Sequence, residues 1–304
     1  MANCIQWYRV AAFAVSGIEM ALLDLKAKAL KTSVADLLGG VVRNPVKWMG
    51  YIFIQSPDAD AKEAAAYAKA GFTELKVKVG RDPNVDVDRI RAIREAVGPK
   101  VAIRIDPNQK WSPKTAVKYI RRMEKYDLQM VEQPTPWQDY EGLAYVRNHV
   151  EAPITADESC GTLQDALALI RLRAVDCFTI YISKAGGMTR AREIARVAEE
   201  SGLPCVLGTW AELGVGTAAQ AHLVASTKNF PFANDTHYTM EGDCVLKKKI
   251  EIVKGATTLD LAKPGLGVEL DRAKVKKAHE SGLKESEFGD DAGAEELPTY
   301  GQFL

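Results

Sequence analysis

Residues 101–134 read VAIRIDPNQKWSPKTAVKYIRRMEKYDLQMVEQP, and this stretch shows the pattern on which the fold prediction rests. A β-branched apolar run ends at Asp106, an amphipathic stretch follows, and a second apolar run ends at Glu132. Short apolar runs that alternate with amphipathic stretches of helical length are typical of parallel strands joined by helices. The stretch therefore predicts one strand–helix–strand unit of an α/β protein.

The same unit recurs on both sides of this stretch. We expect eight strands, at 47–54, 73–79, 101–106, 129–132, 153–156, 176–181, 204–208 and 230–234. The helical patterns between them include 61–70, 87–97, 113–126, 163–172, 188–201 and 216–226. Eight strands, each followed by a helix, predict a closed (β/α) barrel of the TIM type rather than an open sheet. A chain of 304 residues is long enough for such a barrel with additional structure.

Two flanking segments do not follow this rhythm. Residues 16–38 predict one long helix, with Ser16 as its N-cap and Gly39-Gly40 as its end. Residues 241–271 read as short strands and a turn, and 285–304 form an acidic tail. We interpret the flanks as remnants of an α+β capping subdomain over one barrel mouth. The predicted domains are the helical part of the cap at 1–42, the catalytic barrel at 43–240, and a return segment with the tail at 241–304.

Composition and charge exclude several classes of protein. The 40 basic and 40 acidic residues give a formal net charge of zero, so a basic surface for nucleic acid is not expected. The five cysteines are odd in number, spread out and free of CxxC spacing, which argues against a disulfide framework or a zinc site. No apolar run reaches the ~18 residues of a membrane span, and the start lacks a signal-peptide layout. We expect a soluble cytoplasmic protein without a membrane or nucleic-acid partner.

Three acids end three successive predicted strands: Asp106, Glu132 and Asp157, which are 26 and 25 residues apart. Because barrel active sites lie at the carboxyl ends of the strands, we expect the three carboxylates to converge there. Converging anions repel one another unless a cation neutralises them. Oxygen ligands alone suit Mg²⁺ first and Mn²⁺ second. The alternative is that each acid is only the N-cap of the helix that follows.

Lys76 and Lys78 lie two residues apart on a predicted strand, so both side chains point to the face that carries the acids. Beside a divalent cation and another ammonium, a lysine is expected to have a lowered pKa and to act as a base. The alternative is that the pair only balances the charge of the carboxylates.

Five sequence motifs resemble those of one known family. They are KVKVG (76–80), IRIDPNQKW (103–111), VEQPTP (131–136), ADES (156–159) and SKAGGMTRAREIARVAEESG (183–202). In this order they resemble the mandelate racemase/muconate lactonizing branch of the enolase superfamily, and the muconate lactonizing type most of all. The resemblance extends from about Ser16 to Leu270.

The resemblance implies a reaction and a role for each residue. A small carboxylate substrate binds a metal ion and loses its α-proton, and the metal and a lysine stabilise the enolate. Racemisation or epimerisation, cycloisomerisation and dehydration all proceed this way in the family. The implied roles are base for Lys78, electrostatic helper for Lys76, metal ligands for Asp106, Glu132 and Asp157, and orienting, substrate-side groups for Asn108 and Glu158.

The sequence also departs from the family pattern. The muconate lactonizing type has a second lysine five residues before the glycine pair, and here Tyr181 stands at that distance from Gly186-Gly187. Either Tyr181 acts as a weaker acid, or Lys184 takes its place, or only one face of the substrate meets a base. The run VLGTWAE (206–212) contains no histidine, so the His-Asp dyad of the mandelate racemase type is missing. A one-base elimination is thereby favoured over racemisation.

A second departure concerns the amino-terminal part. Family members usually have a full α+β cap before the helix that matches 16–38, and only about 15 residues precede it here. We expect the region that normally supplies specificity loops to be absent, with weaker exclusion of water as the consequence.

Several further polar and aromatic residues have two readings. Asp235 and His237 follow the last predicted strand and either contact the distal end of the substrate or serve turn chemistry. Glu212 either contacts the substrate or lies at a helix start. Trp137 and Trp210 either line an apolar pocket or belong to the core.

Two rival functions stay open at this point. The first is a catalytically impaired family relative that binds metal and a carboxylate ligand. The second is a phosphate-handling barrel, for which the run GTWAELGVG (208–216) and the anion-site-like Gly186-Gly187 pair are weak indications. Because barrels of this family often assemble, a homo-oligomer is expected.

Overall fold

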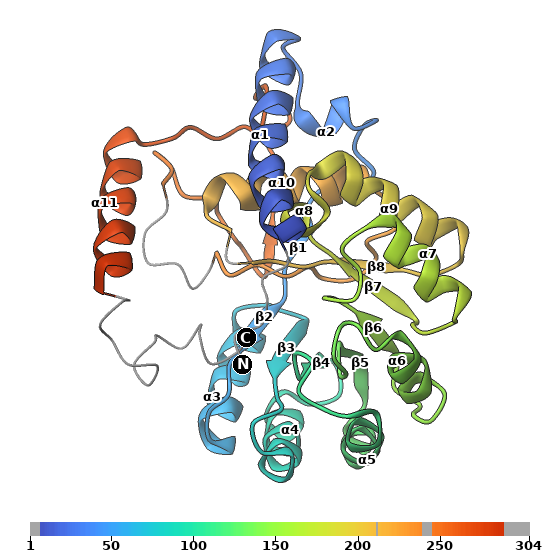
Figure 1. The fold of residues 1–304 in the computed structure, drawn as a ribbon. Helices are drawn as coiled ribbons and strands as arrows, with labels where there is room; N and C mark the ends of the chain where they lie inside the picture. Colours follow the sequence, from blue (N-terminus) through green and yellow to red (C-terminus); the bar gives the residue numbers. More distant parts are fainter. Residues whose placement is uncertain (1–6, 211, 239–244, 289–304) are drawn as a thin grey trace.

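The computed structural model describes residues 7–210, 212–238 and 245–288 of the chain. Its main sheet contains seven parallel strands in the order β2-β3-β4-β5-β6-β7-β8 (Figure 1). Their bounds are β2 Gly50–Ile52, β3 Glu74–Lys78, β4 Ala102–Asp106, β5 Leu128–Glu132, β6 Ile154–Ala156, β7 Cys177–Ile180 and β8 Cys205–Leu207. Strand order follows chain order throughout, as the predicted α/β barrel requires.

The eighth predicted strand, 230–234, does not form a regular strand, but it closes the gap between the sheet edges. The amide of Asp235 donates to the carbonyl of Leu207 beside β8. The amide of Met49 donates to Asn234, and Asn234 forms a parallel bridge with Trp48. The segment thus bonds to both edges, and the barrel prediction is confirmed with one irregular member.

Helices follow the strands and lie on the outside of the strand ring (Figure 1). Their bounds are α3 Pro57–Lys69, α4 Pro83–Val97, α5 Pro113–Met123, α6 Tyr140–Arg147, α7 Leu163–Arg171, α8 Ile182–Ala185, α9 Met188–Glu200 and α10 Gly214–Ser226, with a 3-10 turn, η1, at Glu124–Tyr126. Three helices begin with proline after the N-caps Ser56, Asp82 and Ser112, whose side chains accept hydrogen bonds from the first turn. These starts satisfy amides that have no partner inside the helix.

The prediction for residues 16–38 was wrong in its start and its continuity. α1 spans Trp7–Ala29, and Ser16 lies inside it, where its hydroxyl donates to the carbonyl of Phe13 at 2.7 Å. A second helix, α2 Val34–Leu37, is capped by Ser33. The end at Gly39-Gly40 is confirmed, because both glycines adopt positive φ after α2.

The return segment pairs with the part of the chain that leads into the barrel. β1 Val46–Lys47 pairs antiparallel with β9 Ala256–Thr257, so the predicted strand 47–54 is divided between two sheets. A helix that the sequence did not predict, α11, spans Arg272–Phe288. The predictions for 239–244 and 289–304, and those for Cys4 and Cys244, lie outside the described residues.

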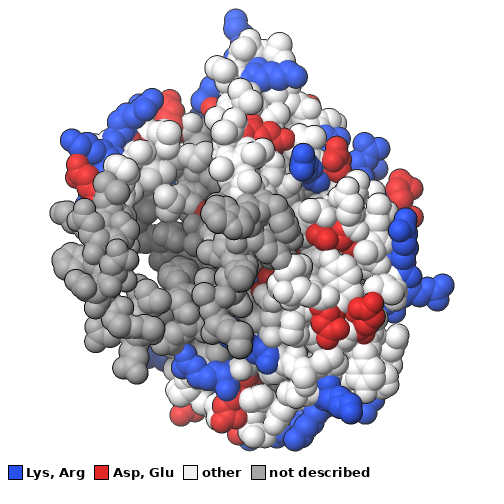
Figure 2. All heavy atoms as spheres, viewed as in Figure 1, with Lys and Arg blue, Asp and Glu red and all other residues white. Residues whose placement is uncertain are grey.

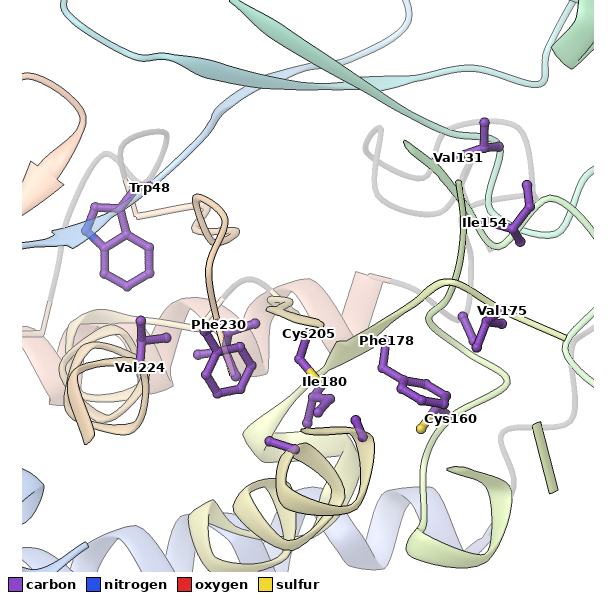
Figure 3. Packing of buried hydrophobic residues seen from close by; sticks show 14 of the residues in the cluster. Trp48, Val131, Ile154, Cys160, Val175, Phe178, Ile180, Cys205, Val224 and Phe230 are labelled. Carbon is purple, nitrogen blue, oxygen red and sulfur yellow. The ribbon is translucent and has the colours of Figure 1, made fainter. Parts of the chain in front are cut away.

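The main core fills the space between the strands and the surrounding helices, where Phe178, Ile180, Cys205, Val224 and Phe230 pack together (Figure 3). The three described cysteines, Cys160, Cys177 and Cys205, are buried free thiols.

A smaller buried cluster lies beneath the candidate site. Its members are Met49, Met130, Cys177, Val206 and Ala233. Met130 precedes Glu132 by two residues on β5, so both side chains point to the same face of the strand. The cluster therefore forms an apolar floor under the charged residues.

The surface of the described part carries mixed charge. On the face shown in Figure 2, basic and acidic residues are interspersed, in keeping with the balanced composition. None of the described helices has the length and apolar character needed to cross a membrane.

Candidate active site

Lys76 occupies the centre of a buried charged cluster at the carboxyl ends of the strands. Its Nζ lies 2.5 Å from Oε1 of Glu132, 2.7 Å from Oδ2 of Asp235 and 3.2 Å from Oδ2 of Asp106. All four side chains are almost completely buried. Three consecutive strands, β3, β4 and β5, and the residue after the closing segment thus supply one charged cluster.

Lys78 extends the cluster toward the barrel mouth. β3 and β4 pair so that Lys78 is opposite Asp106, and its Nζ lies 2.6 Å from Oδ2 of that residue. The same Nζ donates to Oδ1 of Asn108 at 2.5 Å, and the Asn108 amide donates to Oε1 of Glu158 at 3.2 Å. Asn108 and Glu158 therefore orient Lys78 from two different loops.

Tyr181 and Lys184 both bind Asp157. The Tyr181 hydroxyl donates to Oδ2 of Asp157 at 2.6 Å, and Lys184 Nζ lies 2.6 Å from Oδ1. Lys184 also donates to the carbonyls of Asp157 and Thr179. Both candidates for the second face of the substrate are therefore held on one carboxylate.

The ring of Tyr181 is accommodated by a glycine on the next strand. A Cβ at Gly208 would lie 1.8 Å from Cε1 of Tyr181, a distance that no side chain tolerates. The absence of a side chain at Gly208 thus makes room for the aromatic ring that replaces the expected lysine.

The predicted lowering of the lysine pKa values depends on a neighbouring divalent cation and stays a prediction, whereas the protein groups by themselves raise both pKa values. Burial acts to lower the pKa of Lys78, but the negative charges around it, that of Asp106 first, leave its pKa above the ordinary value. The pKa of Lys76 is also raised, because Asp235 and Glu132 outweigh its burial. The sequence argument counted a divalent cation and the neighbouring ammonium, and the structure adds carboxylates at hydrogen-bonding distance, which act in the opposite direction.

The acids divide into two groups. Burial acts to raise the pKa of Asp106, but Lys78 and Lys76 overcome it and lower that pKa to about 2. Lys184 likewise lowers the pKa of Asp157 against burial. Burial raises the pKa of Glu132 well above its ordinary value, and burial with the charge of Asp157 raises the pKa of Glu158 to about 7. Additional positive charge in the cluster would favour ionised Glu132 and Glu158.

The donor set suits a hard cation, although the described side chains do not already enclose one. Among them, no three His, Cys, Asp or Glu residues form a ready metal cluster, and Lys76 lies between the carboxylates of Asp106 and Glu132. Oε2 of Glu132 is buried and has no hydrogen-bond partner in the described part of the chain. A buried carboxylate oxygen without a partner is an available ligand for Mg²⁺.

Asp235 and His237 lie at different places in the site. Asp235 binds Lys76 through Oδ2, and its Oδ1 lies 3.7 Å from Nη1 of Arg104, so it is engaged inside the barrel. His237 is buried against Tyr51, with ring centres 4.5 Å apart. The turn role was expected of Asn234 and Asp235 together, but Oδ1 of Asn234 accepts from the amide of Leu207 on β8, which is a contact between neighbouring strands.

Glu212 and the two tryptophans are not part of the charged cluster. Glu212 accepts hydrogen bonds from Thr209, from the amide of Trp210 at 2.7 Å and from Ser183 at 3.2 Å, so it stabilises the loop before α10. Trp210 is half exposed, and Trp137 is partly buried. None of these contacts joins Glu212 to a lysine of the site.

The anion site predicted near Gly186-Gly187 is occupied by a residue of the chain itself. The carboxylate of Glu19 on α1 accepts hydrogen bonds from the amides of Met188 and Thr189, at the start of α9. A Cβ at Gly187 would lie 2.1 Å from Oε2 of Glu19. The helix N-terminus therefore binds an internal anion.

Sequence reasoning missed two residues of the site. Arg104 is fully buried beneath it, and Tyr51 lies against both lysines, with its ring centre 5.6 Å from Lys76 Nζ and 5.4 Å from Lys78 Nζ. Strand alternation was a usable signal for Arg104, because it precedes Asp106 by two residues and shares its face.

The fold and the site together are those of a (β/α)-barrel enzyme. Acids and lysines from successive strands converge at the carboxyl end of a (β/α) barrel, which is where enzymes of this architecture carry their active sites.

The chain belongs to the mandelate racemase/muconate lactonizing family of the enolase superfamily. The family described as "Enolase C-terminal domain-like" matches residues 59–274, and "Mandelate racemase / muconate lactonizing enzyme, N-terminal domain" matches residues 1–39. The resemblance inferred from the five motifs is thereby confirmed.

The chain is similar in sequence to epimerases and cycloisomerases. It is 40% identical to the hydrophobic dipeptide epimerase of Enterococcus faecalis over 74% of the chain and 65% of that relative. It is 35% identical to a chloromuconate cycloisomerase of Delftia acidovorans over 86% of the chain and 72% of that relative. The chain thus spans about two thirds of the length of these proteins.

A solved structure shows the same fold. The Enterococcus faecalis dipeptide epimerase complexed with Mg and the dipeptide L-Leu-L-Tyr matches with a TM-score of 0.80 and 36% identity, over 84% of this chain and 72% of that one.

Proposed function

We propose that this protein removes the proton α to the carboxylate of a small substrate in a Mg²⁺-dependent reaction that passes through an enolate. The observation that carries the proposal is the pair of buried lysines that bind Asp106, Glu132 and Asp235 at the carboxyl end of the barrel. Relatives named as epimerases and cycloisomerases support it, as does the relative complexed with Mg.

Asp106, Glu132 and Asp157 are the residues that would hold Mg²⁺, with Mn²⁺ as a second possibility. When bound, the ion offsets the second negative charge that develops on the substrate carboxylate as the α-proton leaves. The acid-only donor set and the unpartnered Oε2 of Glu132 support this assignment.

Lys78 is the proposed proton acceptor, because Mg²⁺ bound to Asp106 would offset the negative charge that raises the Lys78 pKa and would favour the neutral amine. Its Nζ is the lysine nitrogen nearer the mouth, and Asp106 and Asn108 fix its direction. Lys76, held by Glu132 and Asp235, remains a fixed positive charge beside the developing enolate. The remaining polar neighbours, Asn108 and Glu158, position Lys78 rather than react.

The second face of the substrate decides the type of isomerisation. Tyr181 and Lys184, which both bind Asp157, are the candidates on this second face. If one of them returns a proton to the α-carbon on that face, the reaction is an epimerisation. If neither does so, the reaction is one-sided, as in cycloisomerisation or dehydration.

The test is exchange of the substrate α-hydrogen in deuterated water, with Mg²⁺ and with a chelator. The panel contains dipeptides, N-acyl amino acids, muconolactone and hydroxy acids. We expect Mg²⁺-dependent exchange for at least one member, loss of exchange in Lys78→Met, and no loss in the exposed control Lys114→Met. Deuterium in product of both configurations at the α-carbon indicates that groups on both faces of the substrate transfer protons. If no member of the panel shows metal-dependent exchange, the proposal is refuted.

A second candidate is a catalytically impaired relative that binds metal and a carboxylate. The engagement of both Tyr181 and Lys184 with Asp157 favours it. Mg²⁺-dependent binding of a carboxylate without exchange would support this candidate.

A further inference from the structure

Arg104 is a buried charge that the proposed reaction does not use. Its side chain is completely buried, and its Nε and Nη1 atoms have no hydrogen-bond partner in the described part of the chain. A buried charge is costly unless other charges and polar groups compensate for it. The groups that compensate for the charge of Arg104 therefore indicate what this side chain does.

Two polar side chains hold one end of the Arg104 guanidinium. Its Nη2 lies 3.3 Å from Oε1 of Gln129 and 3.6 Å from Oε2 of Glu74. Gln129 donates to the same oxygen of Glu74 at 2.9 Å, and the other oxygen of Glu74 accepts from the amide of Ala233 at 3.0 Å. The groups that bind Nη2 are thus themselves fixed, and they fix the orientation of the guanidinium.

The carboxylate of Asp235 lies between Arg104 and Lys76. β3 and β4 pair so that Lys76 and Arg104 are direct neighbours in the sheet, and their like charges repel. Asp235 accepts from Lys76 Nζ through Oδ2 at 2.7 Å. Its Oδ1, which has no hydrogen-bond partner among the described residues, lies 3.7 Å from Nη1 of Arg104. One carboxylate therefore offsets the repulsion between two cations and connects them.

Asp235 differs from the other carboxylates that bind Lys76. Asp106 and Glu132 are proposed ligands of Mg²⁺, so an ion at the site competes with the Lys76 ammonium for their oxygens. Asp235 is outside this set, and it stays available as the partner of Lys76. Its amide donates to the carbonyl of Leu207, so its backbone is fixed as well. The direction of the Asp235 carboxylate is therefore decisive for the position of Lys76.

We infer that Arg104 is a positioning residue: it fixes the carboxylate of Asp235, and Asp235 holds the ammonium of Lys76 beside the place where the negative charge of the enolate develops. The catalytic part of this inference rests on the proposed function, and the positional part rests on the geometry alone. A charge that is fixed before the reaction stabilises the transition state without reorganisation. Arg104 acts through Asp235 and does not itself contact the substrate.

The test variant is Arg104→Met, which removes the charge and keeps a long side chain. Neither neighbouring carboxylate loses its last partner, because Glu74 retains Gln129 and Asp235 retains Lys76. We therefore expect a folded protein. If it does not fold, Arg104→Gln replaces it in both measurements. Arg104→Lys, which keeps a positive charge, tests for rescue.

The first measurement is the ¹⁵N NMR signal of the Lys76 ammonium in the metal-free protein, assigned by its loss in Lys76→Met. This signal should shift and broaden in Arg104→Met, and Arg104→Lys should restore part of the wild-type position. The signal of Lys184, which binds Asp157, should stay unchanged and is the reference within each sample. The control Arg91→Met, at an exposed ion pair, should give the wild-type spectrum. An unchanged Lys76 signal in Arg104→Met would overturn the inference, as would an equal shift of the Lys184 signal.

The second measurement is the rate of exchange of the substrate α-hydrogen. We expect kcat to decrease at least about tenfold in Arg104→Met, as for groups that orient active-site residues, while KM changes less than about threefold. Because Arg104 acts through Asp235, adding Arg104→Met to Asp235→Asn should lower kcat by less than a further factor of about two. A full additional loss in the double variant would contradict the inference.

The two measurements separate this inference from the proposed function. A shifted Lys76 signal in Arg104→Met, together with a wild type that exchanges no substrate, would support the positional role and refute the catalytic proposal. A wild-type kcat and an unchanged Lys76 signal in Arg104→Met would support the catalytic proposal and refute the role of Arg104.

Discussion

The hydroxyl of Tyr181 donates a 2.6 Å hydrogen bond to Oδ2 of Asp157. Lys184 holds the other oxygen of the same carboxylate, so the two side chains available for the second substrate face are coupled through one proposed metal ligand. Any change at Tyr181 is therefore expected to affect metal binding as well as stereochemistry.

Tyr181→Phe removes the donor and keeps the ring over Gly208. Asp157 Oδ2 then loses its orienting partner, so we expect Mg²⁺ affinity to decrease about tenfold, which is typical of a lost contact to a metal ligand. Isothermal titration with Mg²⁺ measures this directly. Tyr145→Phe, at an exposed tyrosine, is the control. Equal affinity in wild type and Tyr181→Phe would show that the hydroxyl does not orient the ligand.

Asp106→Asn is expected to abolish stabilisation by Mg²⁺. A ligand present at 100 times its Kd stabilises the folded state by about 2.7 kcal/mol, which is visible as a higher melting temperature in wild type. The variant retains the shape of the side chain and loses the charge. Asp88→Asn removes an exposed carboxylate and should leave the Mg²⁺ effect intact. A Mg²⁺ shift that survives in Asp106→Asn contradicts the proposed ligand set.

Arg89→Met tests the support beneath the lysine strand. Arg89 is fully buried, lies 2.5 Å from Asp60 and 2.8 Å from Asp86, and donates to the carbonyl of Lys78. Its removal leaves two buried carboxylates without a positive charge, and within the described part of the chain only Asp86 keeps a partner, the Gly80 amide, so we expect a loss of about 3–5 kcal/mol in the free energy of unfolding.

Chemical denaturation measures this loss. The control is Arg91→Met, at an exposed ion pair with Asp88, which should cost less than about 1 kcal/mol. Similar losses in the two variants would mean that the buried pairs contribute no more than surface ones.

His222 gives the fold a dependence on pH. Its Nδ1 accepts a hydrogen bond from the amide of Ala35, and burial lowers its pKa below the ordinary value. Because the unfolded chain binds the proton more tightly, the contribution of His222 to stability is complete above about pH 6.5 and decreases as the pH falls below it.

The measurement is the free energy of unfolding between pH 7.5 and 5.5 for wild type and His222→Gln. The wild type should lose more, by at most about 1.4 kcal/mol per pH unit. Comparing the two proteins cancels the contributions of other groups to the pH dependence. One of these groups is Glu158, whose raised pKa makes the fold more stable as the pH falls. Parallel pH curves would exclude this role of His222.

The barrel was predictable because it depends on local patterns. Seven strands follow from apolar runs, and the helix starts predicted at 113, 163 and 188 agree with α5, α7 and α9. The starts predicted at 61 and 87 were four residues late, because the caps Ser56 and Asp82 were not used. The predicted N-cap at Ser16 failed because a favourable capping residue also fits a helix interior when its hydroxyl bonds to a preceding carbonyl. The irregular segment 230–234 depends on closure with β2 and β8, which a one-dimensional pattern does not contain.

The site was predictable in its membership and less so in its contacts. Strand-end positions alone placed Lys76, Lys78, Asp106 and Glu132 together. The engagement of Asp235 with Lys76 was missed, because it joins residues far apart in the sequence. The roles of the metal ligands, the domain boundaries, a cytoplasmic location and homo-oligomer formation stay predictions.

The bond between Glu19 and the start of α9 joins the amino-terminal helix to the catalytic half of the molecule. The chain reaches α9 directly from the short helix that carries Lys184, so a shift of α1 is transmitted through two backbone amides to the neighbourhood of Asp157. The placement of Lys184 is consequently tied to a carboxylate on α1 that binds the backbone of α9 and not the lysines of the cluster.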